Sequence, residues 1–149
     1  MQLSNNGLQF IKSFEGFKPY PYPDSGQIPT IGYGTIMYPD GSRVTMNDSD
    51  ISEGQGEQYL AYQVKQKTTL VSAMITGSVN QNQFDALVSF AYNLGCGALH
   101  GSHLLQLVNQ GDFDGAANEF PKWNHVNHQV VNGLTRRRAA EQSLFSTPC

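Results

Sequence analysis

The length and composition of the chain favour one compact unit, or two small lobes that share a helix. Its 149 residues carry nine Lys and Arg against twelve Asp and Glu, a net charge of −3, and 39% of them are hydrophobic. The acidic balance argues against nucleic acid as a partner, because binding phosphates draws on a basic surface. No apolar run approaches the roughly 18 residues of a membrane span, so we expect no stable membrane insertion.

The first seven residues lack the basic stretch and the apolar core of a signal peptide. The sequence therefore predicts that the protein accumulates in the cytoplasm. Its two cysteines, Cys96 and Cys149, are expected to be free thiols, which is the default for a chain made in the cytosol.

An amphipathic helix is predicted over residues 3 to 15, where apolar side chains recur at helical spacing. Gly16 ends this helix and leaves Glu15 at its C-terminus. A polar residue near position 4 or 5 is a suitable cap for its first turn.

A small β region is predicted next, over roughly residues 17 to 46. Four prolines between residues 19 and 29 forbid a helix there, and the alternating aromatic residues suit short strands. Residues 30 to 36 resemble a strand. The Pro39-Asp40-Gly41 turn should then fold residues 43 to 45 back as a hairpin.

Helices are predicted for the rest of the chain. A capping-box pattern of Ser52 and Gln55 opens a segment that runs toward Ile75. That segment is long enough for at least its first half to connect two lobes. Asn80 and Gln83 repeat the capping pattern at the start of a second, buried helix.

Gly95 closes this buried helix, and shorter helices are expected after it. They cover residues 103 to 109, residues 113 to 120 and residues 135 to 145, and Pro121 ends the second of them. The predicted fold class is therefore α+β and mainly α.

Two carboxylates and one hydroxyl lie within sixteen residues at the N-terminal end of the β region. Eight residues separate Glu15 from Asp24, and five separate Asp24 from Thr30. Phe14 and Phe17 surround Glu15 with apolar groups that disfavour ionisation, whereas a polar turn follows Asp24. Hydrolysis of a glycosidic bond needs such an unequal pair, because one group protonates the leaving oxygen while the other handles water or the developing positive charge.

Each of these residues also has a structural interpretation. Glu15 can simply end a helix, Asp24 can start a turn, and Thr30 can be an ordinary strand residue. The spacing of the three residues together favours a catalytic role over these structural ones.

Taken with its spacing, this run resembles the N-terminal motif of the phage-type lysozymes, the endolysins or muramidases that cut bacterial peptidoglycan. The family motif is a glutamate, eight residues, an aspartate, five residues and a threonine, in a Glu-Gly-Phe and Thr-Ile-Gly-Tyr-Gly context. One departure is Thr35, which stands where a histidine is common and which we expect to affect the stability of the lobe. The resemblance continues in order through Asn82-Gln83-Phe84-Asp85-Ala86-Leu87, Tyr92-Asn93-Leu94-Gly95, Phe120-Pro121-Lys122-Trp123-Asn124 and Gly133-Leu134-Thr135-Arg136-Arg137-Arg138-Ala139-Ala140-Glu141.

The resemblance implies a single lysozyme-like domain over residues 1 to 149. A small β-hairpin lobe, about residues 14 to 52, would be joined by a long helix to a larger helical lobe. The larger lobe would comprise about residues 76 to 149 and the N-terminal helix, residues 3 to 13. The cleft would lie between the two lobes.

The resemblance also implies hydrolysis of the β-1,4 bond between N-acetylmuramic acid and N-acetylglucosamine, with inversion at the anomeric carbon. Glu15 would be the general acid and Asp24 the base. Thr30 would help to hold the attacking water, since a hydroxyl both donates and accepts hydrogen bonds.

Four further residues match family positions around the substrate. An arginine at the position of Arg137 forms a salt bridge to the catalytic glutamate in the family. Tyr92, Asn93 and Gly34 match positions that contact saccharide, where aromatic rings stack on sugars and amides bond to their polar groups. Helix-end packing is the alternative for Tyr92 and Asn93. For at least one of Arg136 and Arg138 the sequence favours a solvated basic face.

No cofactor is implied. The expected partner is the glycan strand of peptidoglycan, the expected outcome is host cell lysis, and the chain would act as a monomer. A holin-type partner would be needed for a protein held in the host cytoplasm to reach the cell wall in the periplasm.

Three other functions compete with this interpretation. The pairs His100 with His103 and His125 with His128 have metal-compatible spacing and would suit a zinc amidase, but no cysteine or carboxylate stands at a supporting distance, so no metal site is predicted. A wall-binding module without activity has no need of the three motif residues. A lytic transglycosylase needs no positioned water, so Asp24 and Thr30 favour a hydrolase.

Overall fold

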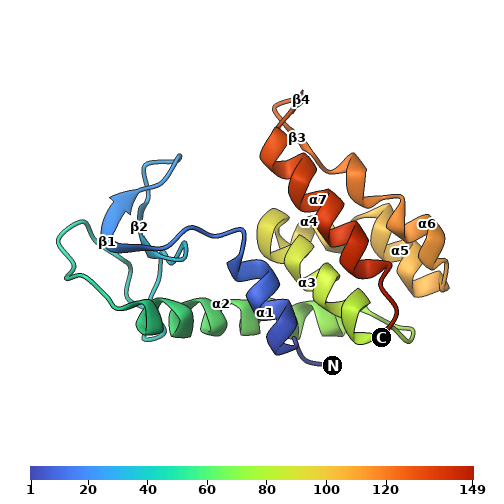
Figure 1. Cartoon of the computed structure of the whole chain (residues 1–149), viewed down its shortest axis with the longest axis horizontal. Coiled ribbons are helices and arrows are strands. Elements are labelled where there is room, and N and C mark those ends of the chain that lie inside the picture. The colour runs from blue at the N-terminus through green and yellow to red at the C-terminus, as the bar shows by residue number, and fades with distance from the viewer. The chain divides into compact units, whose positions relative to one another are not determined.

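Helices dominate the computed structural model, which describes residues 1–149 (Figure 1). The predicted α+β, mainly α class is confirmed, because four short strands form only two antiparallel pairs. None of the helices combines the length and the hydropathy needed to cross a membrane. In chain order the elements are α1 (Asn5–Lys12), β1 (Lys18–Pro23), β2 (Pro29–Gly32), α2 (Glu53–Met74), α3 (Gln81–Leu94), α4 (Cys96–His100), α5 (His103–Gln110), α6 (Phe113–Ala117), the 3-10 helix η1 (Phe120–Lys122), β3 (His125–Val126), β4 (Gln129–Val130) and α7 (Asn132–Phe145).

The chain divides into two compact units. Residues 8–66 form the first, here called the β unit because it contains β1 and β2. Residues 1–7 and 67–149 form the second, here called the helical unit. Helices α1 and α2 each contribute residues to both units, and each unit is described by itself below.

Helix α1 is shorter than the sequence predicts. It ends at Lys12 rather than at Glu15. The three residues after it continue as tight turns, in which the Phe14 N–H donates to the Ile11 carbonyl at 3.1 Å and the Glu15 N–H to the Lys12 carbonyl at 3.0 Å. Glu15 therefore lies on a turn just past the helix.

The antiparallel pair β1–β2 carries the next part of the motif. Tyr22 lies opposite Thr30, and Pro23 opposite Pro29. Proline has no N–H to donate, so the two prolines end the ladder at this point. The chain then reverses between the two strands, in the turn that contains Asp24.

The strand predicted over residues 30 to 36 is interrupted. Strand β2 ends at Gly32, whose φ of 67° lies in the left-handed region that glycine adopts readily. The chain turns there, and Ile31 and Thr35 exchange two backbone hydrogen bonds of 2.9 Å. Gly34 lies in this second turn, which follows the Gly32 end of β2.

The turn predicted at Pro39-Asp40-Gly41 is confirmed. The Gly41 N–H donates to the Tyr38 carbonyl at 2.9 Å, and Met37 pairs with Arg43 in an isolated antiparallel bridge. The returning segment is thus held by single backbone contacts instead of a continuous ladder.

A close packing of Phe17 against α2 anchors the motif segment in the β unit. A Cβ atom at Gly56 would lie only 2.8 Å from Cε2 of Phe17. A larger residue at position 56 would therefore displace the Phe17 ring from this place. The Phe17 ring also packs on Tyr33, with ring centroids 5.0 Å apart. The helix, the segment after Glu15 and the turn after β2 are therefore packed together.

Both predicted capping boxes are confirmed. At the start of α2 the Gln55 N–H donates to the Ser52 hydroxyl at 3.1 Å, and the Ser52 N–H donates to the Gln55 side chain at 3.0 Å. Asn80 and Gln83 repeat this exchange at α3, at 2.8 and 2.9 Å. Such reciprocal bonds satisfy backbone donors that a helix leaves unpaired at its first turn.

In the helical unit, α3 is buried from Gln83 to Ala91 and α7 packs along it (Figure 1). Aromatic rings fill the space beside these helices. Phe90 meets Phe120 edge to face at 5.9 Å and Trp123 at 5.3 Å, and Phe145 completes the group against Phe120 at 5.4 Å.

The later helices depart from prediction at their ends. The helix expected over residues 113 to 120 ends at Ala117, and Pro121 does not terminate it but lies inside η1. Proline is tolerated at the first positions of a helical turn, where its missing N–H would have no partner in any case. Helix α7 begins at Asn132, three residues before the predicted start. The short α4 and the pair β3–β4 were not predicted at all.

Candidate active site

The Glu15 side chain lies against the turn that follows β2. An ideal Cβ atom at Gly34 would be 3.5 Å from Oε2 of Glu15, and Gly34 has a φ of 90°. A larger residue at this position would be strained in its backbone, and its Cβ atom would be in van der Waals contact with the carboxyl group. The half-buried acid therefore lies beside the backbone of the turn that follows β2.

Asp24 is held in the turn between β1 and β2 by its own carboxyl group. Its Oδ1 atom accepts hydrogen bonds from the N–H groups of Gly26 at 2.8 Å and Ile28 at 2.9 Å. The Asp24 N–H donates in turn to the Ile28 carbonyl at 3.0 Å, and its carbonyl accepts from Gln27 at 2.9 Å. These bonds fix the direction of the carboxyl group through Oδ1, while Oδ2 takes no part in the turn.

Thr30 is buried in β2, with 3% of its surface exposed. Its hydroxyl donates to the Ile28 carbonyl at 2.8 Å. The N–H of the same residue, Ile28, donates to Asp24. The hydroxyl proton is therefore committed inside the protein, and the lone pairs of Oγ1 are the part that can serve a ligand.

Tyr22 lies near both carboxylates, and the sequence did not single it out. Burial raises the pKa of the Tyr22 hydroxyl, and the negative charges of Glu15 and Asp24 raise it further. Both carboxyl groups thus lie within electrostatic reach of one ring, directly opposite Thr30 on the strand pair. The sequence did contain a signal for Tyr22, because tyrosines occupy alternate positions of the predicted strand just before Asp24.

A hydrogen-bonded frame supports this part of the β unit. Lys12 forms an ion pair with Glu57 at 3.1 Å, and this contact is the main reason why the pKa of Lys12 is raised. The Tyr33 hydroxyl donates to Glu53 at 2.8 Å, and the Lys12 ammonium lies 5.2 Å from the Tyr33 ring centroid. Helix α1, helix α2 and the turn that contains Gly34 are joined by these contacts.

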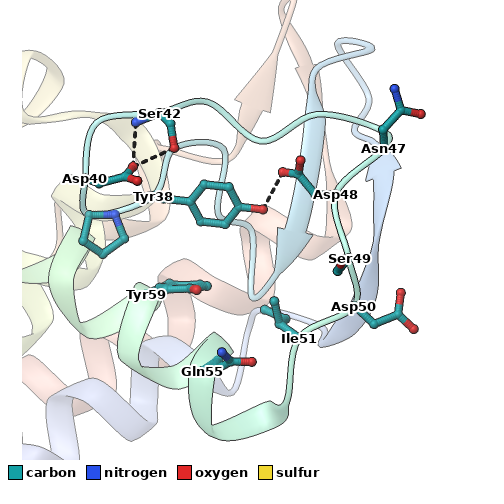
Figure 2. Close-up of a pocket in the computed structure, with 11 residues that line it drawn as sticks. Tyr38, Asp40, Ser42, Asn47, Asp48, Ser49, Asp50, Ile51, Gln55 and Tyr59 are labelled. Atoms are coloured by element: carbon teal, nitrogen blue, oxygen red, sulfur yellow. Dashed lines mark hydrogen bonds between the residues drawn. The ribbon is translucent and has the colours of Figure 1, made fainter.

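The β unit also has an open hollow of about 760 Å³, between the turn at residues 38–42, the loop at residues 47–51 and the start of α2. Figure 2 shows the Tyr38 hydroxyl directed at Asp48, to which it donates at 2.6 Å. Hydrogen bonds from Thr45 and Tyr38 hold the pKa of Asp48 below its ordinary value. Because these contacts join groups of the loop to one another, Asp48 braces the loop. None of the predicted site residues lines this hollow.

The remaining predicted site residues belong to the helical unit. Tyr92 and Asn93 lie half-buried in the last turn of α3, and Arg137 is buried on α7. Arg137 donates from Nε to Glu141 at 3.3 Å and from Nη2 to the Ser89 hydroxyl at 3.3 Å.

The three consecutive arginines of α7 differ sharply in their surroundings. Arg136 is exposed, which agrees with the expected solvated face for at least one of Arg136 and Arg138. Arg138 is fully buried, with its Nε 2.6 Å from Oε1 of Glu141 and its Nη2 2.8 Å from Oδ1 of Asn93. Sequence reasoning missed this residue, although a glutamate three positions later on the same helix was a usable signal.

The histidines of the helical unit have separate surroundings. His103 Nδ1 is 2.8 Å from Oε1 of the buried Glu119, whereas His125 and His128 are exposed on β3 and the turn after it. Cys96 and Cys149 are free thiols, as expected.

The chain is similar to known proteins over almost its whole length. The family model for phage lysozyme matches residues 12–141. The endolysin of Bacillus phage B103 is 44% identical over 147 residues, which are 99% of this chain and 55% of that protein, so the chain spans little more than half the length of this relative.

Solved structures are also similar over almost the whole chain. An endolysin from Escherichia coli O157:H7 phage FAHEc1 is 41% identical and aligns with a TM-score of 0.91, over 98% of this chain and 94% of that one. The muramidase domain of SpmX from Asticaccaulis excentricus is 35% identical, with a TM-score of 0.83 over 99% of both chains. The chain therefore belongs to the phage lysozyme family.

Proposed function

We propose that this protein is a peptidoglycan hydrolase that cleaves the β-1,4 bond between N-acetylmuramic acid and N-acetylglucosamine and so lyses a host cell. The observation that carries the proposal is that the charges of Glu15 and Asp24 both act on Tyr22, which lies directly opposite Thr30 on the strand pair. Hydrolysis of a glycosidic bond typically requires two carboxyl groups in different surroundings, one as acid and one as base or nucleophile. The names endolysin and muramidase of similar proteins support the same substrate.

In this mechanism Glu15 is the general acid that protonates the leaving oxygen. It is half-buried on a turn, and its Oε2 would be 3.5 Å from a Cβ atom at Gly34. We assign Gly34 to the substrate site for the same reason, because its missing side chain leaves room for a sugar beside the acid.

Asp24 is the proposed base. Its Oδ1 is occupied by two backbone N–H groups, so Oδ2 is the atom that would accept a proton from water. Because the turn fixes the carboxyl group through Oδ1, the base needs no reorganisation before the reaction.

Thr30 and Asp24 would hold the attacking water together. The Thr30 hydroxyl already donates to Ile28, so it can only accept from the water. A water that donates one hydrogen to Thr30 and the other to Asp24 has its lone pair left for the anomeric carbon. Room for such a water between base and sugar is the feature of an inverting enzyme.

Tyr92, Asn93 and Arg137 of the helical unit are proposed to bind the glycan strand. An aromatic ring, an amide and a guanidinium offer a stacking surface and hydrogen-bond donors, and all three lie on α3 and α7. We further propose that the two units are lobes of one lysozyme-like domain, and that the chain acts as a monomer. A holin-type partner would let it leave the host cytoplasm.

Digestion of purified peptidoglycan tests this function, through the chemical ends that are released. We expect new reducing ends, and we expect a chelator to leave their release unchanged. New amino ends would indicate an amidase, anhydro ends a lytic transglycosylase, and no new ends a binding module. Proton NMR of the first product should show the α-anomer, because inversion of a β bond gives it; a β-anomer would contradict the inverting mechanism.

A further inference from the structure

A buried ionic network joins α3 and α7 inside the helical unit. The side chains of Arg138 and Glu141 are both 0% exposed, and they meet as a fork, at 2.6 Å from Nε to Oε1 and at 3.0 Å from Nη2 to Oε2. The Ser89 hydroxyl also donates to Oε2 of Glu141, at 2.5 Å. Such two-point pairing holds a guanidinium in one orientation more firmly than a single contact would.

The Arg138 guanidinium is enclosed on its other sides as well. Its Nη1 donates to the Trp123 carbonyl at 3.4 Å, and its carbon Cζ lies 5.3 Å from the centroid of the Phe90 ring. Burial lowers the pKa of Arg138, but the neighbouring Glu141 opposes that change, and a guanidinium stays protonated in proteins. Arg138 is therefore a fixed set of donors that cannot turn into acceptors.

Asn93 accepts a further hydrogen bond from this set. Nη2 of Arg138 lies 2.8 Å from Oδ1 of Asn93, in the last turn of α3. An amide side chain can present either its oxygen or its NH2 group to a neighbour, and a guanidinium can bind only the oxygen. The Arg138 contact thus fixes which way the Asn93 amide faces, and its NH2 group is turned away from the network.

We propose that Arg138 is a positioning residue for glycan binding. It orients the Asn93 amide so that the NH2 group donates to an acceptor oxygen of the sugar strand. This inference rests on the proposed function, in which Asn93 belongs to the binding surface, and it adds the residue that decides what Asn93 can recognise. A buried ion pair of this kind is weak evidence for stability alone, because desolvation of both ions offsets much of their attraction.

The test compares Arg138→Lys, Asn93→Ala and the double variant in binding to chitotetraose, measured by isothermal titration calorimetry. Lysine keeps the charge beside Glu141 but lacks the planar fork. Each single variant should weaken binding by about 10-fold, as expected when one hydrogen bond to the ligand is lost. The double variant should bind no more weakly than Asn93→Ala, since Arg138 acts only through Asn93. An additive loss in the double variant would overturn the proposal.

Glu119→Gln is the matched control. Glu119 is another buried carboxylate of the helical unit, paired with Lys122 and His103, so its loss should lower the melting temperature without changing affinity. If Arg138→Lys behaves like this control, with lower stability and unchanged affinity, the residue is structural and the proposal fails.

The amide group itself gives a second readout. In ¹⁵N–¹H NMR spectra the Asn93 NH2 signals should shift when chitotetraose is added to the wild-type protein and should shift much less with Arg138→Lys. A full shift in that variant would contradict the proposed orientation. A wild-type protein that binds chitotetraose through Arg138 and Asn93 but releases no reducing ends would refute the proposed hydrolysis and leave this inference standing. A wild-type protein that does not bind it would overturn the inference.

Discussion

The two units hold their charged side chains in different ways. In the β unit, Glu15 and Asp24 lie half-buried on turns, and Asp24 is fixed by backbone N–H groups at 2.8 and 2.9 Å. In the helical unit, Arg138 and Glu141 are fully buried and are fixed by each other. In the proposed mechanism Glu15 and Asp24 exchange protons, so their carboxyl groups must reach water and substrate. Groups that only orient others can be sealed inside the core.

The comparison predicts two kinds of failure on mutation. Isosteric changes at the turns of the β unit should remove activity and leave the fold intact. Changes in the network of the helical unit should remove stability first, because an unpaired ion is left in the core.

Glu15→Gln should give the largest effect. The amide keeps the shape of the side chain but cannot supply a proton, so release of reducing ends should fall by at least about 10²- to 10⁴-fold, the usual contribution of general acid catalysis. Circular dichroism and the melting temperature should stay near wild type. Glu57→Gln, which only removes the ion pair with Lys12, is the control that should keep most of the activity. A Glu15→Gln protein that clears cell walls at the wild-type rate would exclude Glu15 as the acid.

Asp24→Asn should have an effect of similar kind. An asparagine can still accept the N–H groups of Gly26 and Ile28 through its oxygen, so the turn should persist. The base is nevertheless lost, and we expect turnover to drop by about 10²-fold or more. Retention of activity with an unchanged turn, checked by the backbone amide shifts of Gly26 and Ile28, would remove Asp24 from the mechanism.

Glu141→Gln tests the other side of the comparison. The carboxylate accepts from Arg137, Arg138 and Ser89, and its loss leaves buried guanidinium charge uncompensated. Denaturant unfolding should show a loss of about 3–5 kcal/mol, the cost of breaking a buried ion pair from one side. A loss below about 1 kcal/mol, the worth of an exposed pair, would mean that water reaches the network and that it is not sealed as the structure has it.

Local features of this fold could be predicted from the sequence, because they depend on residues a few positions apart. The Ser52 and Asn80 capping boxes and the turn at residues 39–41 are examples, since each hydrogen-bonds to its own neighbours in the chain. Pro121 shows the limit of such rules. It was expected to stop a helix, but the chain had already left the helix at Ala117.

The motif of the proposed site comes from the sequence, whereas its supporting residues come from the structure. The spacing of the motif residues is the basis for proposing Glu15 and Asp24, whereas the place of the Tyr22 ring near both depends on strand pairing. For the arginines of α7, the sequence could not decide which ones are buried. That outcome depends on packing against α3, where Arg138 meets Asn93.

Two threonines of the β unit offer a finer comparison, since both are buried but only one hydroxyl is bonded. Thr30 donates to the Ile28 carbonyl at 2.8 Å, and Thr30→Val would leave that carbonyl without its partner. We expect Thr30→Val to lose about 1 kcal/mol of stability and to slow hydrolysis by about 10-fold, since the water loses its acceptor. Thr30→Ser keeps the hydroxyl and should keep the rate; a Thr30→Val enzyme with the wild-type rate would reduce Thr30 to a structural strand residue.

Thr35→Val should change stability in the opposite direction, and it is the smallest effect we predict. Thr35 is 0% exposed, and its Oγ1 has no hydrogen-bond partner. A buried hydroxyl without a partner costs its desolvation, and valine has nearly the same shape without that cost. The variant should therefore gain about 1 kcal/mol in denaturant unfolding while the rate of hydrolysis stays unchanged. A destabilised Thr35→Val protein would mean that this hydroxyl is hydrogen-bonded in solution, and the two threonines would then be held in the same way.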